Sequence, residues 1–189
     1  KVLDGSIGRQ LMDEIEKAGM KGLAFWENGF RNLTNSKRPV KNPADAKGLK
    51  IRTQENKIHI AAWKAVGVNA VPMAWGEVYG ALQQKAIDGQ ENPIAVIYSV
   101  KLNEVQKYLT LDGHTWSEDV IMMNGQRLKE LPAAAQQLIR AAGYRAAIAG
   151  RMAEEFNTQL LKMPVVQKSM EIYTPTSEEL AEFQKFARP

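Results

Sequence analysis

An arginine at the end of one predicted strand is the clearest side chain for binding chemistry in this sequence. Arg52 closes the segment LKIR and is followed by the polar loop TQEN. In an open α/β sheet, the ends of the strands meet the crevice in which ligands bind. A guanidinium there offers a planar fork that pairs with a carboxylate through two parallel hydrogen bonds. Exposure of Arg52 on the surface of an ordinary strand is the alternative interpretation.

A second polar cluster lies in the segment AIDGQENP, residues 86–93. Asp88 followed by Gly89 is typical of a turn, and Pro93 prevents a helix from continuing through the segment. We therefore predict a short turn directly after an amphipathic helix. This turn would carry three side chains rich in hydrogen-bonding groups: Gln90, Glu91 and Asn92.

The helix before this turn begins with an aromatic residue, Trp75. An indole at a helix start can form an apolar wall for the carbon chain of a ligand, and a partly buried core residue is the alternative. Glu77, in the first turn, complements the positive end of the helix dipole.

The sequence lacks the motifs for metal binding, nucleophilic catalysis, nucleotide binding and nucleic-acid binding. The sequence has no cysteine, and its two histidines, His59 and His114, are far apart and lack a HExxH motif or a carboxylate cage, so we expect no metal site. No GxSxG motif and no glycine-rich phosphate loop are present, so neither nucleophilic catalysis nor a nucleotide cofactor is expected. The net charge of +4 is small and the basic residues do not cluster, which argues against nucleic acid as a partner.

The 189 residues, of which 44% are hydrophobic and 24% charged, are typical of a folded α/β protein. Helices are predicted at 6–19, 42–48, 56–67 and 74–87, a helical or mixed stretch at 94–109, a long small-residue-rich helix from Pro132, and a last helix opened by a Thr176–Glu179 capping box. Strands are predicted at 21–30, 49–53, 69–73, 108–116, 119–124 and 171–175. In the helix at 56–67, the spacing of Ile58, Ala61, Ala62 and Ala65 predicts the inward face.

Three segments carry a resemblance to a known family: GLKIRTQEN, PMAWGEVYGALQQKAIDGQENP and EVQKYLTLDGHTW. In this order and spacing they resemble the substrate-binding proteins of TRAP (tripartite ATP-independent periplasmic) transporters, of the C4-dicarboxylate-binding type. The resemblance covers nearly the whole chain. It implies a periplasmic binding protein-like α/β fold with two lobes, a ligand cleft, a hinge and a long helix that bridges the lobes.

The resemblance also implies a division of the chain between the lobes. Residues 1–29 would belong to lobe 1, 30–117 to lobe 2, 118–157 to the lobe 1 return segment and bridging helix, and 158–189 to the C-terminal helices of lobe 2. Such proteins usually carry roughly a hundred further residues before the point that matches Lys1, so we expect lobe 1 to be incomplete here. The chain starts without Met and without a signal segment, which fits either a removed leader or a piece of a longer protein.

Carried over position by position, the resemblance assigns ligand contacts to seven residues. The carboxylate-binding arginine falls on Arg52, and its partner asparagine on Asn92, whose amide would bond to both the ligand and Arg52. The remaining contacts would be a second basic residue, an aromatic wall where the family often has Phe, two loop residues and an acid: Arg31, Trp75, Glu55, Asn56 and Asp119.

The resemblance thus implies a bacterial periplasmic receptor that captures a small organic acid and delivers it to TRAP membrane subunits, with no catalysis and no cofactor. The ligand would be a dicarboxylate, a sugar acid or a uronate. An enzyme on a similar scaffold, such as a hydrolase or decarboxylase of organic acids, is the alternative, although no paired acid/base or nucleophile motif supports it. An interaction domain without a small ligand is a third possibility.

Overall fold

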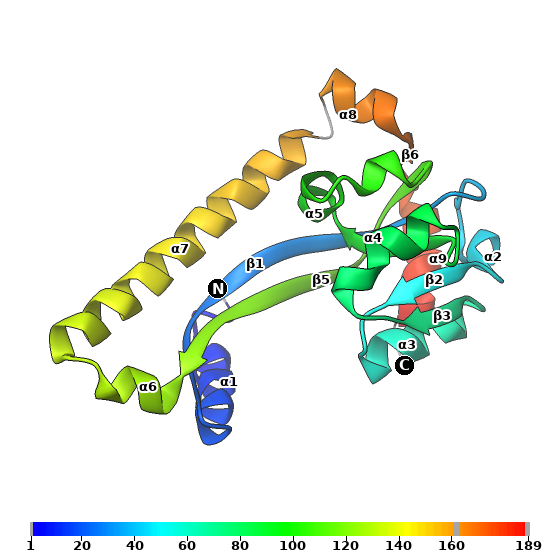
Figure 1. Ribbon diagram of the computed structural model, residues 1–189. Coiled ribbons are helices and arrows are strands. Elements are labelled where there is room, and N and C mark those ends of the chain that lie inside the picture. The colour runs from blue at the N-terminus through cyan, green and yellow to red at the C-terminus, as the bar shows by residue number, and fades with distance from the viewer. Residues whose placement is uncertain (1, 161–162, 188–189) are drawn as a thin grey trace. The chain divides into compact units, whose positions relative to one another are not determined.

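A computed structural model describes residues 2–160 and 163–187 of the chain. The chain divides into two compact units (Figure 1). Unit 1 comprises Lys1–Gly29 and Ser117–Phe156, and unit 2 comprises Phe30–Trp116 and Asn157–Pro189.

Helices and strands alternate along the chain, as predicted. In order they are α1 (Ser6–Lys17), β1 (Met20–Asn35), α2 (Pro43–Ala46), β2 (Lys50–Thr53), α3 (Lys57–Ala65), β3 (Asn69–Pro72), α4 (Trp75–Gln83), β4 (Gly89–Pro93), α5 (Ile94–Ser99), the 3₁₀ helix η1 (Leu102–Glu104), β5 (Tyr108–Asn124), α6 (Gly125–Glu130), α7 (Ala133–Leu160), α8 (Pro164–Ser169), β6 (Glu171–Tyr173) and α9 (Ser177–Ala187).

The strands of the described residues form one six-stranded sheet in the order β3-β2-β4-β1-β5-β6. The strand β2 is parallel to both β3 and β4, whereas β4 is antiparallel to β1. The carboxyl ends of β2, β3 and β4 therefore lie on the same side of the sheet, and β4 ends beside Arg31, near the point where β1 enters unit 2.

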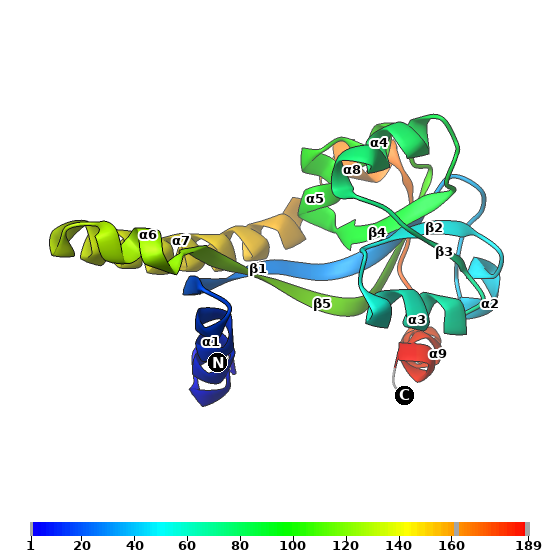
Figure 2. The same cartoon turned by 60° about the horizontal axis from the view of Figure 1, so that its bottom comes forward.

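Both hydrophobic clusters of the described residues belong to unit 2, one on each face of its sheet (Figure 2). On one face, α4, α5 and α8 cover a cluster that includes Val78, Leu82 and Ile97. On the other face, α3 and α9 cover a cluster that includes Trp63 and Phe183. The face on which a strand residue lies thus decides which helices it meets.

The segment predicted as a turn is the strand β4. All five of its residues, Gly89–Pro93, are buried, and they pair with β1 from Arg31↔Pro93 to Asn35↔Gly89. The prediction was wrong because polar residues and a DG pair are typical of turns, whereas here the polar side chains are paired inside the sheet. The Asp88 carboxylate closes the preceding bend by accepting from the Lys50 N–H at 2.9 Å.

The predicted inward face of α3 was also wrong. Ile58 is 76% exposed and Trp63 is the buried residue of the helix. A buried indole removes far more apolar surface from water than three alanines do, so Trp63 sets the orientation of α3.

Two strand predictions were too short. The strand at 21–30 continues to Asn35 in β1, and the two strands predicted at 108–116 and 119–124 are one strand, β5, of 17 residues. Two predicted caps are confirmed, whereas Ser6, which was also expected to cap a helix, is the first helical residue of α1 and Gly5 stands at the N-cap position. Asn42 and Asp45 form a capping box at α2, and Thr176 and Glu179 form one at the start of α9.

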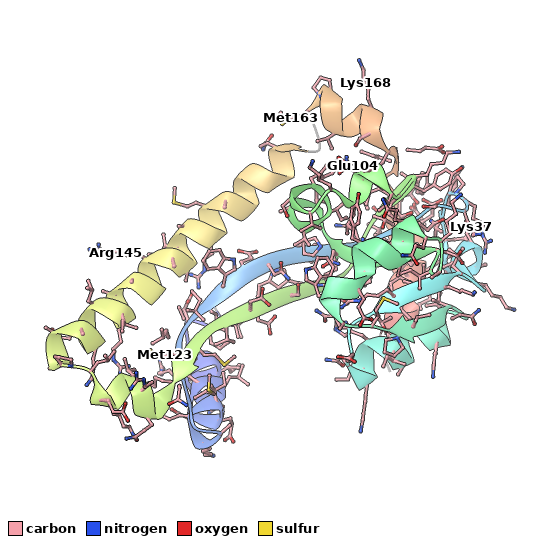
Figure 3. The ribbon with its side chains drawn as sticks, viewed as in Figure 1. Lys37, Glu104, Met123, Arg145, Met163 and Lys168 are labelled. Carbon is pink, nitrogen blue, oxygen red and sulfur yellow. The ribbon has the colours of Figure 1, made fainter. Side chains whose placement is uncertain are left out.

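In unit 1, small residues bring α7 close to β1. A Cβ added to Gly143 would lie 3.0 Å from the Leu23 Cβ, and one added to Gly150 would lie 2.9 Å from the Trp26 ring. Side chains on the opposite surface of α7, such as Arg145, project outward (Figure 3). Gly143 and Gly150 therefore allow the close approach of α7 to β1.

Candidate functional site

Four of the predicted site residues lie at the sheet edge where the carboxyl ends of three parallel strands meet the antiparallel β1. Arg52 and Asn92 are the last residues but one of β2 and β4, Trp75 follows β3 as the first residue of α4, and Arg31 lies opposite Pro93 on β1. In open α/β sheets this edge, next to a change of strand direction, is where ligands bind.

The Arg52 guanidinium is held in place through one of its nitrogens. Its Nε donates to the Met73 carbonyl at 3.0 Å, and its Cζ lies 5.5 Å from the centroid of the Trp75 ring. Within the described part of the chain Arg52 makes no other hydrogen bond, so the four N–H groups on its terminal nitrogens remain available. The whole residue is only 5% exposed, and burial lowers the pKa of Arg52 while the Glu91 charge opposes that shift. The result is an oriented cation whose bidentate end has no internal partner.

The Asn92 amide is held by a chain of polar side chains rather than by Arg52. Its Nδ2 donates to Gln90 Oε1 at 2.5 Å, and Gln90 Nε2 donates to Thr34 Oγ1 at 2.9 Å. Thr34 in turn donates to Gln106 Oε1 at 2.8 Å. The hydrogen bond expected between Asn92 and Arg52 is absent from the described residues, and this chain takes over the role of fixing the amide.

Neighbouring residues of β4 point to opposite faces of the sheet, as in any strand. Gln90 and Asn92 lie on the face covered by α4 and α5, together with Arg52. Glu91 lies on the other face, since its cross-strand partner Leu33 belongs to the α3/α9 cluster. Arg31 shares that second face, whereas Arg52 lies on the first, and the charge of Arg31 still contributes to the lowered pKa of Arg52.

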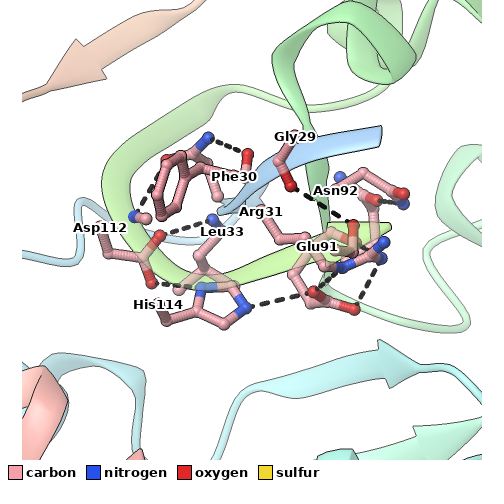
Figure 4. Close-up of polar contacts among 12 residues, drawn as sticks. Gly29, Phe30, Arg31, Leu33, Glu91, Asn92, Asp112 and His114 are labelled. Carbon is pink, nitrogen blue, oxygen red and sulfur yellow. Dashed lines mark hydrogen bonds and ion pairs between the residues drawn. The ribbon is translucent and has the colours of Figure 1, made fainter. Parts of the chain in front are cut away.

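On that second face four charged side chains form a buried group, here named the Arg31 network: Arg31, Glu91, His114 and Asp112 (Figure 4). Arg31 donates to Glu91 through Nε at 2.5 Å and through Nη2 at 2.9 Å. The His114 ring lies between two carboxylates, with Nε2 3.1 Å from Glu91 Oε2 and Nδ1 2.8 Å from Asp112 Oδ2. Asp112 Oδ1 accepts from the Leu33 N–H at 3.1 Å, which ties the network to β1.

The charges of the Arg31 network balance only when His114 is protonated. Burial by itself lowers the pKa of His114, but the charge and hydrogen bond of Asp112, with those of Glu91, raise it to about 10. Burial by itself raises the pKa of Glu91, but the hydrogen bonds from His114 and Arg31 lower it to about 2. At neutral pH the network is therefore two cations and two anions.

The remaining predicted site residues lie in three different settings. Asn56 caps α3, where its Oδ1 accepts from the Ile58 N–H at 2.8 Å. Glu55 is exposed in the loop after β2, and its charge partly opposes the lowering of the Arg52 pKa by burial. Asp119 is exposed on the part of β5 that belongs to unit 1, whereas the other six predicted residues belong to unit 2.

Three members of the Arg31 network were not predicted as site residues. His114 was expected only not to bind a metal, Asp112 carried no prediction, and Glu91 was expected only to supply hydrogen-bonding groups to a turn. The signal was present in the alternation of Asp112 and His114 along one strand, which places both side chains on one face. This alternation could be interpreted as part of a site only once β4, which carries Glu91, was known to be a strand of the same sheet as β5.

Two kinds of feature are absent from residues 2–160 and 163–187. None of the helices there is long and apolar enough to cross a membrane. No group of three or more histidine, aspartate or glutamate side chains in this part of the chain is placed to bind a metal ion.

Comparison of the sequence with known protein families identifies the family of this chain. The model of the DctP family, the bacterial extracellular solute-binding proteins of family 7, matches residues 1–189. The chain belongs to this family.

Relatives with names or bound molecules are similar over most of the chain. The C4-dicarboxylate-binding periplasmic protein DctP of Rhodobacter capsulatus is 35% identical over 100% of this chain and 57% of its own. The 2,3-diketo-L-gulonate-binding periplasmic protein YiaO of Escherichia coli K12 is 47% identical over 74% of this chain and 42% of its own. A TRAP periplasmic solute-binding protein from Polaromonas sp. JS666 has a crystal structure with bound D-erythronate. It matches this chain with a TM-score of 0.93 and 39% identity, and the match covers 100% of this chain and 62% of the Polaromonas chain.

These similarities confirm the predicted α/β fold class of periplasmic binding protein type and the predicted family. The chain spans 42% and 57% of the length of these two curated relatives.

Proposed function

We propose that the chain is the part of a bacterial extracytoplasmic receptor that grips the carboxylate of a small organic acid for delivery to a TRAP membrane transporter. The family consists of solute-binding proteins. A C4-dicarboxylate, 2,3-diketo-L-gulonate and D-erythronate, which the relatives bind by name or in the crystal, all carry a carboxylate. The shared chemistry is therefore one anionic group at one end of a short polar molecule.

The observation that carries the proposal is the unpaired end of the Arg52 guanidinium. Its Nε is fixed by the Met73 carbonyl, while its terminal N–H groups have no partner among the described residues. A buried cation with free, coplanar donors is suited to a carboxylate, which accepts two parallel hydrogen bonds from it. Because the side chain is already oriented, less conformational entropy is lost when the ligand binds.

In this proposal the other residues have separate roles. The Asn92 amide, fixed by Gln90, bonds to a carboxylate oxygen or to a neighbouring hydroxyl group. The Trp75 ring, 43% exposed above Arg52, forms the apolar wall beside the carbon chain. Arg31 supports the site from the other face of the sheet by fixing Glu91, the residue before Asn92.

Three weaker assignments complete the proposed site. Glu55 and Asn56 border it from the loop after β2. Asp119 would contact the distal, hydroxylated end of the ligand after closure of two lobes. Binding would favour the closed form, and the membrane subunits would recognise that form.

The decisive experiment is calorimetric titration of wild type and Arg52→Ala with succinate, D-erythronate and D-galacturonate. Loss of the charged partner of a buried carboxylate is expected to cost at least ~2 kcal/mol, or roughly thirtyfold in Kd. Arg52→Lys keeps the charge but loses the bidentate geometry, so its affinity is expected to be intermediate.

The control variant is Arg127→Ala, because Arg127 is 79% exposed in a surface pair with Glu130. Its affinity is expected to match that of wild type. Unchanged affinity in Arg52→Ala would remove Arg52 from the site, and turnover of any of these acids, followed by NMR, would favour an enzyme instead.

A further inference from the structure

Unit 1 contains a pocket of about 210 Å³ that the proposed receptor function does not use. It lies where the end of α1, the start of β1, α6 and α7 meet. Its lining includes the following residues: Glu16, Gly19, Lys21, Gly125, Lys129 and Arg140. We name it the Lys21 pocket; none of its residues belongs to the Arg52 site or to the Arg31 network.

Two glycines bring the walls of the Lys21 pocket together. Gly19, two residues after α1, has a φ of +85°, a conformation that other residues adopt only with strain. Its carbonyl accepts from the Gly125 N–H at 2.9 Å, and a Cβ on Gly125 would lie 3.0 Å from that same oxygen. This close backbone contact fixes the end of α1 against the start of α6, so that long side chains from both sides border one cavity.

The charge in the Lys21 pocket is strongly unbalanced. Three cations, Lys21, Lys129 and Arg140, line it together with one carboxylate, that of Glu16. Lys21 forms an ion pair with Glu16, whereas neither Lys129 nor Arg140 forms an ion pair with any residue in the described ranges. Two positive charges at the pocket are thus left without an internal counterion.

The charges of all three cations act on the Glu16 carboxylate. The pKa of Glu16 is lowered first by the hydrogen bond and charge of Lys21, and further by the charges of Lys129 and Arg140. An oxyanion beside Glu16 would be in the same field. Arg140 can offer it a bidentate contact, and the two lysines can each donate a charge-assisted hydrogen bond.

We propose that the Lys21 pocket is a second binding site, specific for a small oxyanion with two negative charges, which inorganic phosphate represents. The residual double positive charge matches the charge of the ligand. The volume, about seven times the roughly 30 Å³ that one water occupies, admits a tetrahedral oxyanion with part of its hydration shell. Occupation links α1, α6 and α7 through one anion, so it stabilises unit 1.

The test is calorimetric titration of the chain with inorganic phosphate at pH 7.5, with ionic strength held constant by sodium chloride. One site is expected in wild type. The double variant Lys129→Ala/Arg140→Ala is expected to bind roughly tenfold more weakly or worse, because two charge-assisted contacts are lost. Glu16→Gln is expected to bind a few-fold more tightly, because the only competing carboxylate is removed.

Two controls separate this site from general charge effects and from the Arg52 site. Arg145→Ala removes an exposed arginine from α7 outside the pocket, and Arg52→Ala removes the proposed carboxylate clamp. Both are expected to keep the phosphate affinity of wild type. The proposal is overturned if wild type binds no phosphate, if the double variant binds as wild type does, or if Arg52→Ala alone abolishes binding. Circular dichroism confirms folding, and Arg140→Gln replaces the double variant if that variant is unfolded.

Discussion

At the scale of residues, alternation along β4 gives neighbouring side chains different tasks. Asn92 lies on the face of Arg52 with its amide fixed by Gln90, while Glu91 lies on the opposite face in the Arg31 network. The backbone between them is shared, so the position of the Asn92 amide depends on how well Glu91 is held. The polar density of the segment thus combines a proposed ligand contact with the support for its strand.

The first prediction concerns the buried ion pair of Arg31 and Glu91, whose side chains are both 1% exposed. Arg31→Ala leaves the Glu91 carboxylate with one cationic partner, His114, instead of two. Breaking a buried pair by removing one partner typically costs about 3–5 kcal/mol. The free energy of unfolding of Arg31→Ala, measured by urea denaturation, is expected to fall by roughly this amount.

The matched comparison is the exposed pair of Arg127 and Glu130, with side chains 79% and 47% exposed. Arg127→Ala is expected to change the free energy of unfolding by less than about 1 kcal/mol, as is usual for surface pairs. Equal effects of the two substitutions would mean that the Arg31 network contributes no more than a surface contact.

The second prediction concerns the two histidines, which are expected to titrate in opposite directions from 6.5. The pKa of His114 is raised to about 10, whereas the pKa of His59 is lowered, mainly by burial. Proton NMR at pH 8 should therefore show one protonated and one neutral imidazole. In Glu91→Gln, which removes one of the two carboxylates at His114, the higher pKa should fall; two titrations near 6.5 in wild type would contradict the balanced charges of the network.

The same shifts fix the pH dependence of stability. Because the pKa of His114 is raised, protonated His114 stabilises the fold fully below pH 6.5, and this stabilisation is lost as the pH rises toward 10. Because the pKa of Glu91 is lowered, ionised Glu91 stabilises the fold fully above pH 4.5, and this stabilisation is lost as the pH falls toward 2. The Arg31 network therefore stabilises the fold most between pH 4.5 and 6.5.

At the scale of elements, the sequence predicted what depends on local signals. Caps were found because Asn42 is followed by Pro43, which suits the first helical position, and because Thr176 stands three residues before Glu179, which completes a capping box. The strand at Arg52 and the helix at Trp75 were found because glycines and apolar spacing mark them. The resemblance to the family then directed attention to Arg52 and Asn92, which the structure places at one edge and on one face of the sheet.

Elements whose state depends on distant partners could not be predicted. The segment GQENP is polar enough for a turn, and only pairing with β1 and β2 makes it a buried strand. The pairing side chains lie far away in the chain: Thr34 for Gln90, and Arg31 and His114 for Glu91. A reading of local composition cannot show that a polar residue has a buried partner about sixty positions earlier.

The third prediction tests how closely β4 approaches its neighbours. A Cβ added to Gly89 would lie 2.1 Å from the Thr34 carbonyl oxygen and 2.9 Å from a terminal methyl of Ile51. Because the nearest atom is backbone, the clash can be relieved only by moving β4 away from β1. Gly89→Ala is therefore expected to lower the free energy of unfolding by more than about 2 kcal/mol, measured by urea denaturation.

Gly80, in the middle of α4, is the matched control. A Cβ there meets nothing within 4 Å, and alanine is the better helix former by about 1 kcal/mol. Gly80→Ala is expected to leave stability unchanged or to raise it by up to that amount. A tolerated Gly89→Ala would show that β4 is not pressed against Thr34 as described.

At the scale of the whole molecule, the apolar core is unevenly divided between the two units. Both hydrophobic clusters of the described residues lie in unit 2. In unit 1, large apolar side chains of α1 and α7 are exposed, among them Ile7 at 53%, Leu138 at 71% and Met152 at 69%. Since apolar burial is the main favourable term in folding, the two units should differ in stability.

The last prediction is that unit 1 opens more readily than unit 2. Native-state hydrogen exchange should show amides of α1 exchanging through a sub-global opening, at a free energy below that of the amides in β2 and β4. Those two strands are central in the sheet and carry Ile51, which is fully buried. Substituting Ile51→Val should lower the protection of β2 and leave that of α1 unchanged, because an opening confined to unit 1 does not expose Ile51. Equal protection in α1 and β2, or a loss in both on that substitution, would mean that the chain unfolds as one cooperative body despite its unevenly divided core.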